Sequence, residues 1–542
     1  MNTASFKDAR GLSAFSMWIA FSLFLVACVL GVYQVAERSG LFPALESPEL
    51  YFASVSTHGV LMAFVLTTFL VMGFGYYSAT TSLKQSLWSP SLAWIGFFVS
   101  LGGTLMAAWA LLTGQASVLF TFYPPLKAHP FFYIGATLLV IGSWVWCLQM
   151  IMMMRQWKRN NPGEPVPLVM FGNVANAIMW IWTSLGVAAE MLFQLIPWSL
   201  GLIDTVDVGL ARTLFSWTLH AIVYFWLFPA YIALYTLLPR LAGGRLFSDE
   251  MGRIAFIMLL VISVPIGFHH LYMDPFQEAG WKFLHMAGTF LVVLPTLITG
   301  FTILASLEVA GRNQGGRGLL GWIGALPWRE PMVTAAGLGL LLLTLGGFGG
   351  VVNASYAMNA MVHNTQWVTG HFHLIFGGTV VILYFAIAYH LWPRFTGRRL
   401  FSPGLARFQL WTWFGGILLL TIPWHIIGLL GQPRRVSSTP YDSPLVEMWT
   451  IHEILMFFGG VVMLLSALAF ILNLVFTHFS AKTDGLVMQY AEPLNPVYKL
   501  PALLNGFGFW NLILFIYMIV SYGYPIAQFF LIETHGVMPW GI

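Results

Sequence analysis

Six histidines lie within long apolar stretches of the sequence, where a polar side chain needs an explanation. They are His58, His220, His269, His270, His371 and His373. An ionisable side chain in a lipid-embedded helix is costly and is by default a candidate for function. Imidazole is a common ligand of copper and of haem iron. Six such residues in one chain therefore point to metal chemistry.

The spacing of these histidines indicates how many metal centres they form. His371 and His373 are two residues apart, about 200° around a helix, so they face opposite sides and fit two separate centres. His269 and His270 are about 100° apart and can reach one metal if the helix end is slightly unwound. Tyr224 follows His220 by one helical turn and shares its face, which places a phenol beside a candidate ligand.

The composition places these residues in a membrane. The chain has 542 residues, of which 58% are hydrophobic and 8% are charged, and its mean hydropathy is +0.78. A soluble domain has about 25% charged residues, so soluble, disordered and nucleic-acid-binding proteins are excluded. Cys28 and Cys147 lie far apart in apolar runs, which predicts neither a disulfide nor a CxxC metal site.

Runs of about 20 apolar residues predict an all-α polytopic protein with about thirteen transmembrane helices. The predicted segments are 14–36, 50–78, 92–113, 131–154, 166–196, 209–238, 251–273, 280–307, 333–351, 365–393, 408–430, 448–477 and 507–532. The loops between them are short and rich in Pro, Gly and Arg. We therefore expect a single domain over residues 1–542.

The distribution of Lys and Arg predicts the orientation, because these residues are retained in cytoplasmic loops. With a cytoplasmic N-terminus, all but six of the 24 Lys and Arg residues fall on the inner side. An odd number of helices then places the C-terminus outside. The same topology places all six histidines in the outer half of the bilayer.

Four segments around these residues resemble the catalytic subunit of the haem–copper oxidases. They are HGVLMAF (58–64), WTLHAIVYFW (217–226), VPIGFHHLYMDP (264–275) and HNTQWVTGHFHL (363–374). Three further segments resemble its B family, the ba3-type cytochrome c oxidases. They are TFYPPLKAHP (121–130), LPRLAGGRLFSD (238–249) and VVNASYAMNAMVHNTQW (351–367). The resemblance covers nearly the whole chain, and thirteen helices is the number in that family.

The resemblance implies a specific set of cofactors. His58 and His373 would be the axial ligands of a low-spin haem, and His371 the proximal ligand of a high-spin haem. Copper would be held by the remaining three, His220, His269 and His270. The types of the two haems stay open, because ligation by histidine does not depend on the substituents of the porphyrin.

The resemblance also implies roles for three residues that bind no metal. In the family, the residue at Tyr224 is covalently bonded to the copper ligand at His220. A phenol at that place can supply an electron and a proton when the O–O bond is cleaved. The adjacent Arg434 and Arg435 match the pair that binds haem propionates, which arginine can bind through two hydrogen bonds.

The activity implied by the resemblance is reduction of dioxygen to water with electrons from cytochrome c, coupled to proton translocation in the cell (inner) membrane. The chain lacks a cluster of Cys, His and Met that could form a dinuclear copper electron-entry site. A partner subunit must therefore contain that site. Small single-helix subunits are further expected partners, and no nucleic-acid partner is expected.

Two stripes of hydroxyl groups fit the single proton path of the B family. Tyr224, Tyr231 and Tyr235 follow one another at steps of seven and four residues. Thr296, Thr299 and Thr302 follow at steps of three. The A family's second path ends at a Glu two residues after the copper ligand, where this chain has Ile222.

The outer loop before the predicted helix 365–393 differs from the B-family pattern at one position. His363 and Asn359 lie where the family places groups near the propionate of the high-spin haem. B-type members have Asp at the position of Asn359. This difference questions whether that position accepts a proton here.

Two other functions share some of these features. A nitric oxide reductase of the same superfamily has iron with an added Glu ligand as its second metal and lacks the tyrosine, so Tyr224 argues against it. A secondary transporter would also explain many helices with intramembrane histidines, but it predicts inverted repeats and broken helices, and the sequence shows no convincing repeat.

Overall fold

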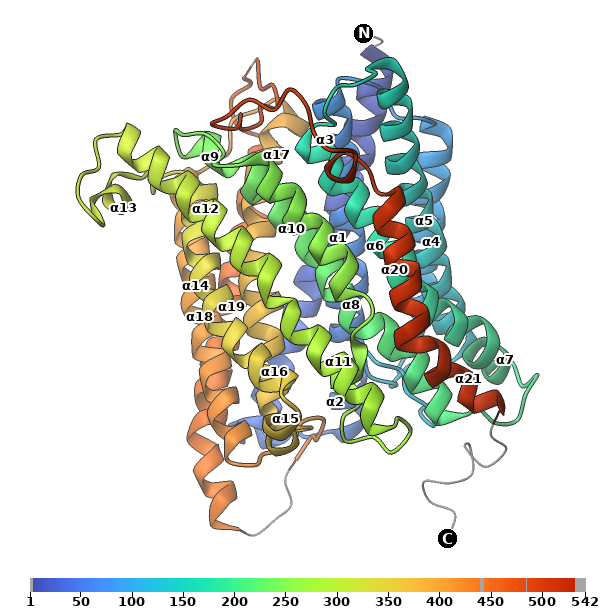
Figure 1. Cartoon of the computed structure of the whole chain (residues 1–542). Coiled ribbons are helices and arrows are strands. Elements are labelled where there is room, and N and C mark those ends of the chain that lie inside the picture. Colours follow the sequence, from blue (N-terminus) through green and yellow to red (C-terminus); the bar gives the residue numbers. More distant parts are fainter. Residues whose placement is uncertain (1–2, 439–442, 484, 532–542) are drawn as a thin grey trace.

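Helices account for all the regular structure of the computed structural model, which describes residues 3–438, 443–483 and 485–531 (Figure 1). This is the expected result, because lipid offers the backbone no hydrogen bonds and a helix satisfies them internally. The α-helices are α1 (Thr3–Arg38), α2 (Pro48–Val60), α3 (Thr67–Leu83), α4 (Pro90–Leu112), α5 (Pro130–Asn160), α6 (Leu168–Glu190), α7 (Ile196–Ser199), α8 (Val208–Thr236), α9 (Leu238–Leu241), α10 (Asp249–Ser263), α11 (Ala279–Leu291), α12 (Val293–Asn313), α13 (Gly321–Ala325), α14 (Pro331–Ala354), α15 (Tyr356–Val362), α16 (Gln366–Phe372), α17 (Val381–Thr396), α18 (Pro403–Leu429), α19 (Pro444–Thr477), α20 (Gly508–Met518) and α21 (Tyr524–Leu531).

Several long helices contain or adjoin a turn of different pitch. The 3-10 turns are η1 (Pro43–Leu45), η4 (Gly267–Leu271) and η6 (Ala502–Leu504). The π-helical turns are η2 (Leu61–Leu66), η3 (Met191–Leu195), η5 (His373–Val380) and η7 (Ile519–Gly523). Such π turns are frequent at functional sites. Here η2 begins three residues after His58, and η5 begins at His373 itself.

The starts of four long helices share one local signal in the sequence, a serine followed by a proline. The pairs are Ser47–Pro48, Ser89–Pro90, Ser402–Pro403 and Ser443–Pro444. Each serine hydroxyl accepts a hydrogen bond from a backbone N–H of the first turn, and proline suits the first helical position because it has no N–H to leave unpaired. The sequence therefore specifies locally where α2, α4, α18 and α19 begin.

Twelve of the thirteen predicted segments coincide with a helical segment that is long and apolar enough to cross a membrane. The exception is the segment predicted at 251–273. Its helix, α10, has only 15 residues and ends at Ser263. Pro265 follows two residues later, after the C-cap Val264, and proline cannot donate the hydrogen bond that would continue a helix. The chain then forms η4, the 3-10 turn that contains His269 and His270.

Gly267 lets this turn lie directly against α8. A Cβ atom at that position would collide with the backbone oxygen of Ser216, one turn before His220. α10 runs alongside α12, and η4 contacts α11 (Figure 1). The break at Val264–Ile266 is the unwinding that two adjacent histidines require to reach one metal.

The two ends of the bundle are well separated in Figure 1, where α1 starts at the upper end and α21 finishes at the lower end. The terms upper and lower below refer to that view. Which end faces the cytoplasm stays a prediction from the Lys and Arg distribution. The C-terminal residues 532–542 lie outside the described part of the chain.

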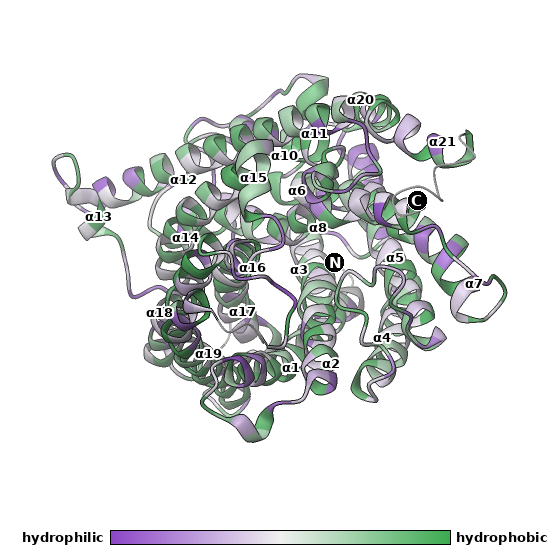
Figure 2. Cartoon of the chain, turned by 90° about the horizontal axis from the view of Figure 1, so that it is seen from below, coloured by the Kyte–Doolittle hydropathy of each residue, from purple (hydrophilic) through white to green (hydrophobic). Residues whose placement is uncertain are grey.

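The outward faces of the peripheral helices are apolar. On α14 the exposed side chains Leu341, Leu345 and Phe348 follow at steps of four and three residues, which makes one stripe. Figure 2 shows hydrophobic residues along peripheral helices such as α14 and α18, whereas hydrophilic residues gather in the connections. A stripe of this kind suits contact with lipid chains.

One buried ion pair secures the upper end of α10. The guanidinium of Arg253 is 1% exposed and donates to the carboxylate of Asp249 one turn earlier. It also donates to the carbonyl of Val166 at 2.6 Å and to that of Leu504 at 3.3 Å. Arg253 thereby joins α10 to the loops before α6 and α20.

We predict that Arg253→Met lowers the free energy of unfolding by about 3–5 kcal/mol, because it leaves the buried Asp249 carboxylate without a partner. Arg312→Met is the control, since Arg312 pairs with Glu308 one turn away on an exposed surface and should cost less than about 1 kcal/mol. Thermal unfolding of the detergent-solubilised protein measures both. Equal effects of the two variants would contradict the stabilising role assigned to the buried Arg253–Asp249 pair.

Candidate metal centre

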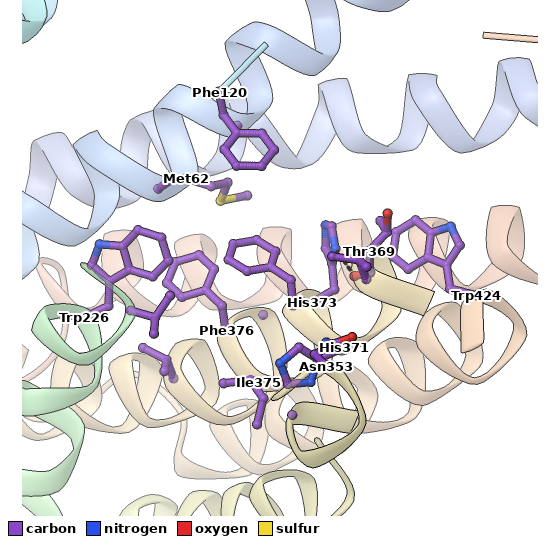
Figure 3. Close-up of a pocket in the computed structure, with 18 of the residues that line it drawn as sticks. Met62, Phe120, Trp226, Asn353, Thr369, His371, His373, Ile375, Phe376 and Trp424 are labelled. Carbon is purple, nitrogen blue, oxygen red and sulfur yellow. Dashed lines mark hydrogen bonds between the residues drawn. The ribbon is translucent and has the colours of Figure 1, made fainter. Parts of the chain in front are cut away.

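A central cavity of about 980 Å³ brings all six histidines together. Its lining is mainly apolar and comes from helices that are distant in sequence, including α1, α2, α8, α14 and α18. Figure 3 shows part of it, with His371 and His373 projecting from neighbouring turns among aromatic side chains. Large cofactor sites are typically apolar cavities with a few directed polar groups.

Three of the histidines form a compact cluster, His220 of α8 with His269 and His270 of η4. One ring nitrogen from each lies within 4.8 Å of the other two. The Nδ1–H of His269 donates to the carbonyl of Ile266 at 2.8 Å, which leaves Nε2 as its free ligand atom. Three neutral imidazoles at this spacing suit copper or another transition metal. The cluster therefore fits the ion that the sequence predicted for it.

Tyr224 lies against this cluster. Its phenol oxygen is 3.1 Å from Nε2 of His220, and the two ring centroids are 5.1 Å apart. This contact occupies Nε2 of His220, so Nδ1 is the nitrogen that can bind a metal. The phenol thus stays outside the ligand set while touching one of its members.

His58 of α2 and His373 of η5 face each other across the cavity. Their ring centroids are 6.3 Å apart, and their ring planes differ by 23°. Each Nδ1–H donates to a backbone carbonyl, that of Ala27 at 2.7 Å for His58 and that of Thr369 at 2.8 Å for His373. Imidazole nitrogens bind metals at about 2.0 Å, so the gap between the rings has room for a single metal ion. The pair fits the two axial ligands of one haem.

His371 faces a different helix from His373. Its Nδ1–H donates to the carbonyl of Gly346 in α14 at 3.0 Å. A Cβ atom at Gly349 would lie 2.9 Å from its ring, so only glycine lets α14 approach this closely. His373, by contrast, contacts His58 and Trp424 of α18. The two histidines therefore face separate parts of the cavity.

The charged side chains that line the cavity are all arginines. Among the described residues they are Arg38, Arg212, Arg434 and Arg435, with no Asp, Glu or Lys. Arg38 has a carboxylate partner in Glu453 at 3.3 Å, and Arg212 has one in Asp274 at 3.0 Å. A cavity with this lining fits an anionic cofactor, and the propionates of haems are such anions.

Arg434 and Arg435 have no carboxylate partner in the described part of the chain. Arg434 donates to the side-chain oxygen of Asn364 at 3.0 Å, whereas the Nε of Arg435 is buried without a partner. Burial lowers the pKa of Arg434 to about 9, and the neighbouring charge of Arg435 adds to this. Arg435 also has a positive φ of 63°, a strained conformation typical of functional sites. Both groups would be stabilised by a bound anion.

Arg38 and Arg212 were not among the site residues predicted from the sequence. From the sequence, each of these two arginines is one of the six Lys and Arg residues predicted on the outer side, near the end of a helix. One sequence feature could have identified Arg212 as a site residue, because it lies eight residues before His220 on the same helix, α8. Arg38 has no such marker, because the helix that contains it has no histidine.

Asn359 and His363 form a small network beside the cavity. The Nδ1–H of His363 donates to Oδ1 of Asn359 at 3.0 Å, and the Asn359 amide donates to the carbonyl of Asn353 at 2.7 Å. Burial lowers the pKa of His363 to about 4, and the positive charge of Arg434 acts in the same direction. His363 is therefore neutral at pH 7 in the absence of a nearby anion.

The two predicted hydroxyl stripes lie side by side on α8 and α12. The phenol of Tyr235 donates to Oγ1 of Thr299 at 3.0 Å. Tyr231 lies near Thr296, but its hydroxyl has no hydrogen-bond partner among the described residues. Thr299 and Thr302 each donate to a carbonyl of their own helix. The stripes are thus adjacent, with gaps that water molecules would have to bridge.

The chain matches the family model described as "Cytochrome C and Quinol oxidase polypeptide I" over residues 12–462. It is 38% identical over 530 residues to cytochrome c oxidase subunit 1 of Thermus thermophilus, an alignment that covers 94% of this chain and 93% of the relative. The subunit 1 of Thermostichus vulcanus is 25% identical over 525 residues and is covered to 88%.

A solved structure, described as a cryo-EM structure of a heme-copper terminal oxidase dimer, has the same fold. The TM-score is 0.91 and the sequence identity 37%, with 97% of this chain and 93% of that chain covered. The likeness therefore extends over nearly the entire bundle.

We predict that His269→Ala abolishes high-affinity binding of one copper ion, because the cluster loses one of its three ligands. His390→Ala is the matched control, since His390 is an intramembrane histidine on α17 outside the cavity lining. Copper content per purified chain, measured by plasma mass spectrometry, distinguishes the two. Full copper occupancy in His269→Ala would contradict the cluster as a metal site.

Proposed function

The chain belongs to the cytochrome c and quinol oxidase polypeptide I family, the haem–copper oxidases, and from this membership we propose how its residues act. It is the catalytic subunit of a terminal oxidase that reduces dioxygen to water with electrons from cytochrome c and couples this reaction to proton translocation. The observation on which the proposal rests is the cavity itself, in which six histidines converge and every charged lining residue is an arginine.

We assign the cofactors to the histidines as follows. His58 and His373 would hold a low-spin haem and His371 a high-spin haem. The cluster of His220, His269 and His270 would hold copper. Arg434 and Arg435 would neutralise haem propionates. When bound, these groups supply electrons for the overall reaction, in which one dioxygen takes up four electrons and four protons to form two water molecules.

The role proposed for Tyr224 follows from its contact with His220. Its phenol holds a proton at the oxygen that lies 3.1 Å from Nε2 of the imidazole. That places a group able to donate both a proton and an electron one helical turn from the copper site. A covalent bond between the two rings, as the family implies, would fix this geometry.

Protons reach Tyr224 from the upper end of the bundle in this proposal. Tyr231 and Tyr235 with Thr296, Thr299 and Thr302 form the two adjacent stripes of hydroxyl groups. The hydrogen bond between Tyr235 and Thr299 joins the stripes. The phenol of Tyr231, beside Thr296 and without a hydrogen-bond partner in the described part of the chain, can bind water. With a cytoplasmic N-terminus, the upper end is the inner side of the cell membrane, and the metal centres lie in the outer half.

The ba3 subtype and the partners are finer parts of the proposal. The motifs quoted above and the 38% identity to the Thermus thermophilus subunit support the subtype. Electron transfer from cytochrome c would require a second subunit with a dinuclear copper site, and small single-helix subunits would complete the complex. Nitric oxide reduction is disfavoured, because the described metal cluster contains three histidines and no glutamate.

Cofactor analysis of the purified complex tests the proposal directly. Pyridine haemochrome spectra and metal analysis should find two haems and one copper ion in addition to the two copper ions of the dinuclear site on the second subunit. Non-haem iron in place of copper would instead indicate a nitric oxide reductase.

We predict that His58→Ala and His373→Ala each remove the low-spin haem spectrum while copper stays bound, because each takes one of two axial ligands. His371→Ala should instead abolish carbon monoxide binding by the high-spin haem. Optical and electron paramagnetic resonance spectra report both. A normal six-coordinate low-spin signal in His58→Ala or His373→Ala would refute the ligand assignment.

We predict that Tyr224→Phe keeps both haems and copper but lowers dioxygen turnover by at least ~100-fold, the scale of a lost proton donor. Tyr384→Phe is the control, because the buried phenol of Tyr384 donates to the carbonyl of Trp226 and is outside both stripes. Mass spectrometry of the wild type should find the peptide with His220 and Tyr224 two hydrogens lighter than its sequence. Normal dioxygen turnover in Tyr224→Phe, together with an unmodified wild-type peptide, would contradict the proposed role of Tyr224 as a donor of a proton and an electron.

A further inference from the structure

The connection between α12 and α14, residues 314–329, projects sideways from the upper end of the bundle. It contains the short helix α13, and Figures 1 and 2 both place this helix outside the outline of the long helices. A segment in this position must contact whatever surrounds the bundle at that level.

Contacts within this connection hold its shape. The indole N–H of Trp322 donates to the carbonyl of Leu319 at 3.0 Å. The indole N–H of Trp328 donates to the carbonyl of Ile323 at 2.7 Å. Trp322 also packs so closely on the end of α12 that a Cβ atom at Gly311 would collide with its backbone oxygen. The connection is therefore a defined structure, and the side chains that it exposes have fixed directions.

The most exposed side chains of the connection are apolar. Leu319 is 85% exposed and Leu320 is 66% exposed, and Ile323 is exposed on the turn that follows. Large aliphatic side chains are unfavourable in water, and a group of them on a surface marks a contact site. These residues therefore require an apolar environment beside the bundle.

The charged side chains of the same connection are all positive. Arg317 and Arg329 are exposed, and residues 312–329 contain no Asp or Glu. Neither arginine forms an ion pair with another described residue. The next acidic residue, Glu330, is partly buried at the start of α14 and interacts with Arg394. The connection thus offers two unneutralised cations next to its exposed leucines.

The length of α14 indicates the level of this connection in the membrane. α14 has 24 residues, which is about 36 Å at 1.5 Å per residue, whereas the hydrocarbon core of a bilayer is about 30 Å thick. Its first residue, Pro331, therefore lies close to the edge of that core. Residues 314–329 directly precede Pro331 and lie at the level of the lipid headgroups, continuous with the apolar outer stripe of α14.

We propose that the connection between α12 and α14 is a binding site for anionic phospholipids of the surrounding bilayer. Arg317 and Arg329 bind the negatively charged headgroups, and Leu319 and Leu320 enter the boundary of the acyl chains. This combination of exposed cations and apolar side chains is typical of segments that lie in the membrane interface. With a cytoplasmic N-terminus the site faces the inner leaflet, whose anionic lipids attract basic segments.

Photo-crosslinking at Leu319 tests this site in the assembled complex. A photoreactive benzoylphenylalanine in place of Leu319 is illuminated in nanodiscs that contain equal amounts of phosphatidylglycerol and phosphatidylcholine. Mass spectrometry of the peptide should find phospholipid adducts in which phosphatidylglycerol predominates. The double variant Arg317→Gln/Arg329→Gln should lower the ratio of the two lipids in the adducts by about fivefold for each arginine.

Arg245→Gln/Arg312→Gln is the matched control. These two arginines are also exposed at the upper end of the bundle, but each has a carboxylate partner, Glu492 for Arg245 and Glu308 for Arg312. The control should therefore leave the lipid ratio at position 319 unchanged. High salt should lower the phosphatidylglycerol preference of the wild type, because it screens exposed charges.

An adduct with protein in place of lipid would overturn the proposal, because a second copy of this chain or another subunit would then cover Leu319. Lipid adducts with the same headgroup ratio in the wild type and in Arg317→Gln/Arg329→Gln would also overturn it, because the arginines would then take no part. Neither readout depends on the metal centres, so the result is independent of the proposed catalytic function.

Discussion

An imidazole buried in a membrane bundle must satisfy one of its nitrogens before the other can bind a metal, and the arrangement of helices around the cavity follows from this constraint. His58, His371 and His373 each donate from Nδ1 to a backbone carbonyl, and His269 does the same. Backbone oxygens hold the rings more rigidly than mobile side chains could. For His58 and His371 the accepting carbonyl belongs to another helix, so helix packing fixes their rings. For His373 and His269 it lies three or four residues earlier in the chain.

This constraint explains why small residues and broken helices surround the cavity. A carbonyl can reach a histidine on another helix only if the two helices approach closely, as Gly31 and Gly349 allow. The turn η4 lies against α8 only because residue 267 is glycine. The π turn η5 begins at His373, directly after the helix that contains His371. Departures from regular helix thus occur where side chains must be aimed.

Electrostatics impose a second requirement on the same cavity. Among the residues that the structure describes, four arginines line it, and two of these have carboxylate partners. Burying unpaired cations is unfavourable, so an anionic group bound beside Arg434 and Arg435 would stabilise the bundle. Binding of such groups stabilises the fold by linkage. Carboxylate partners partly neutralise Arg38 and Arg212, so the four arginines are not equivalent toward a bound anion.

The sequence alone predicted an all-helical membrane protein with about thirteen spans, twelve of which coincide with helices long and apolar enough to cross a membrane. It also singled out the six histidines as candidate ligands, because both predictions depend on apolar run length and on residue type at known spacing. It also indicated that His269 and His270 needed an unwound helix end. Tertiary structure decided what local spacing cannot encode: the 6.3 Å gap between His58 and His373, the side of His220 that Tyr224 touches, and the presence of Arg38 and Arg212 at the cavity. In the segment predicted at 251–273, the helix end follows locally from Pro265, whereas the close packing of η4 on α8 is a contact between residues far apart in the chain. Helix propensity and hydrophobic periodicity act over a few turns, whereas which helices become neighbours depends on packing throughout the bundle.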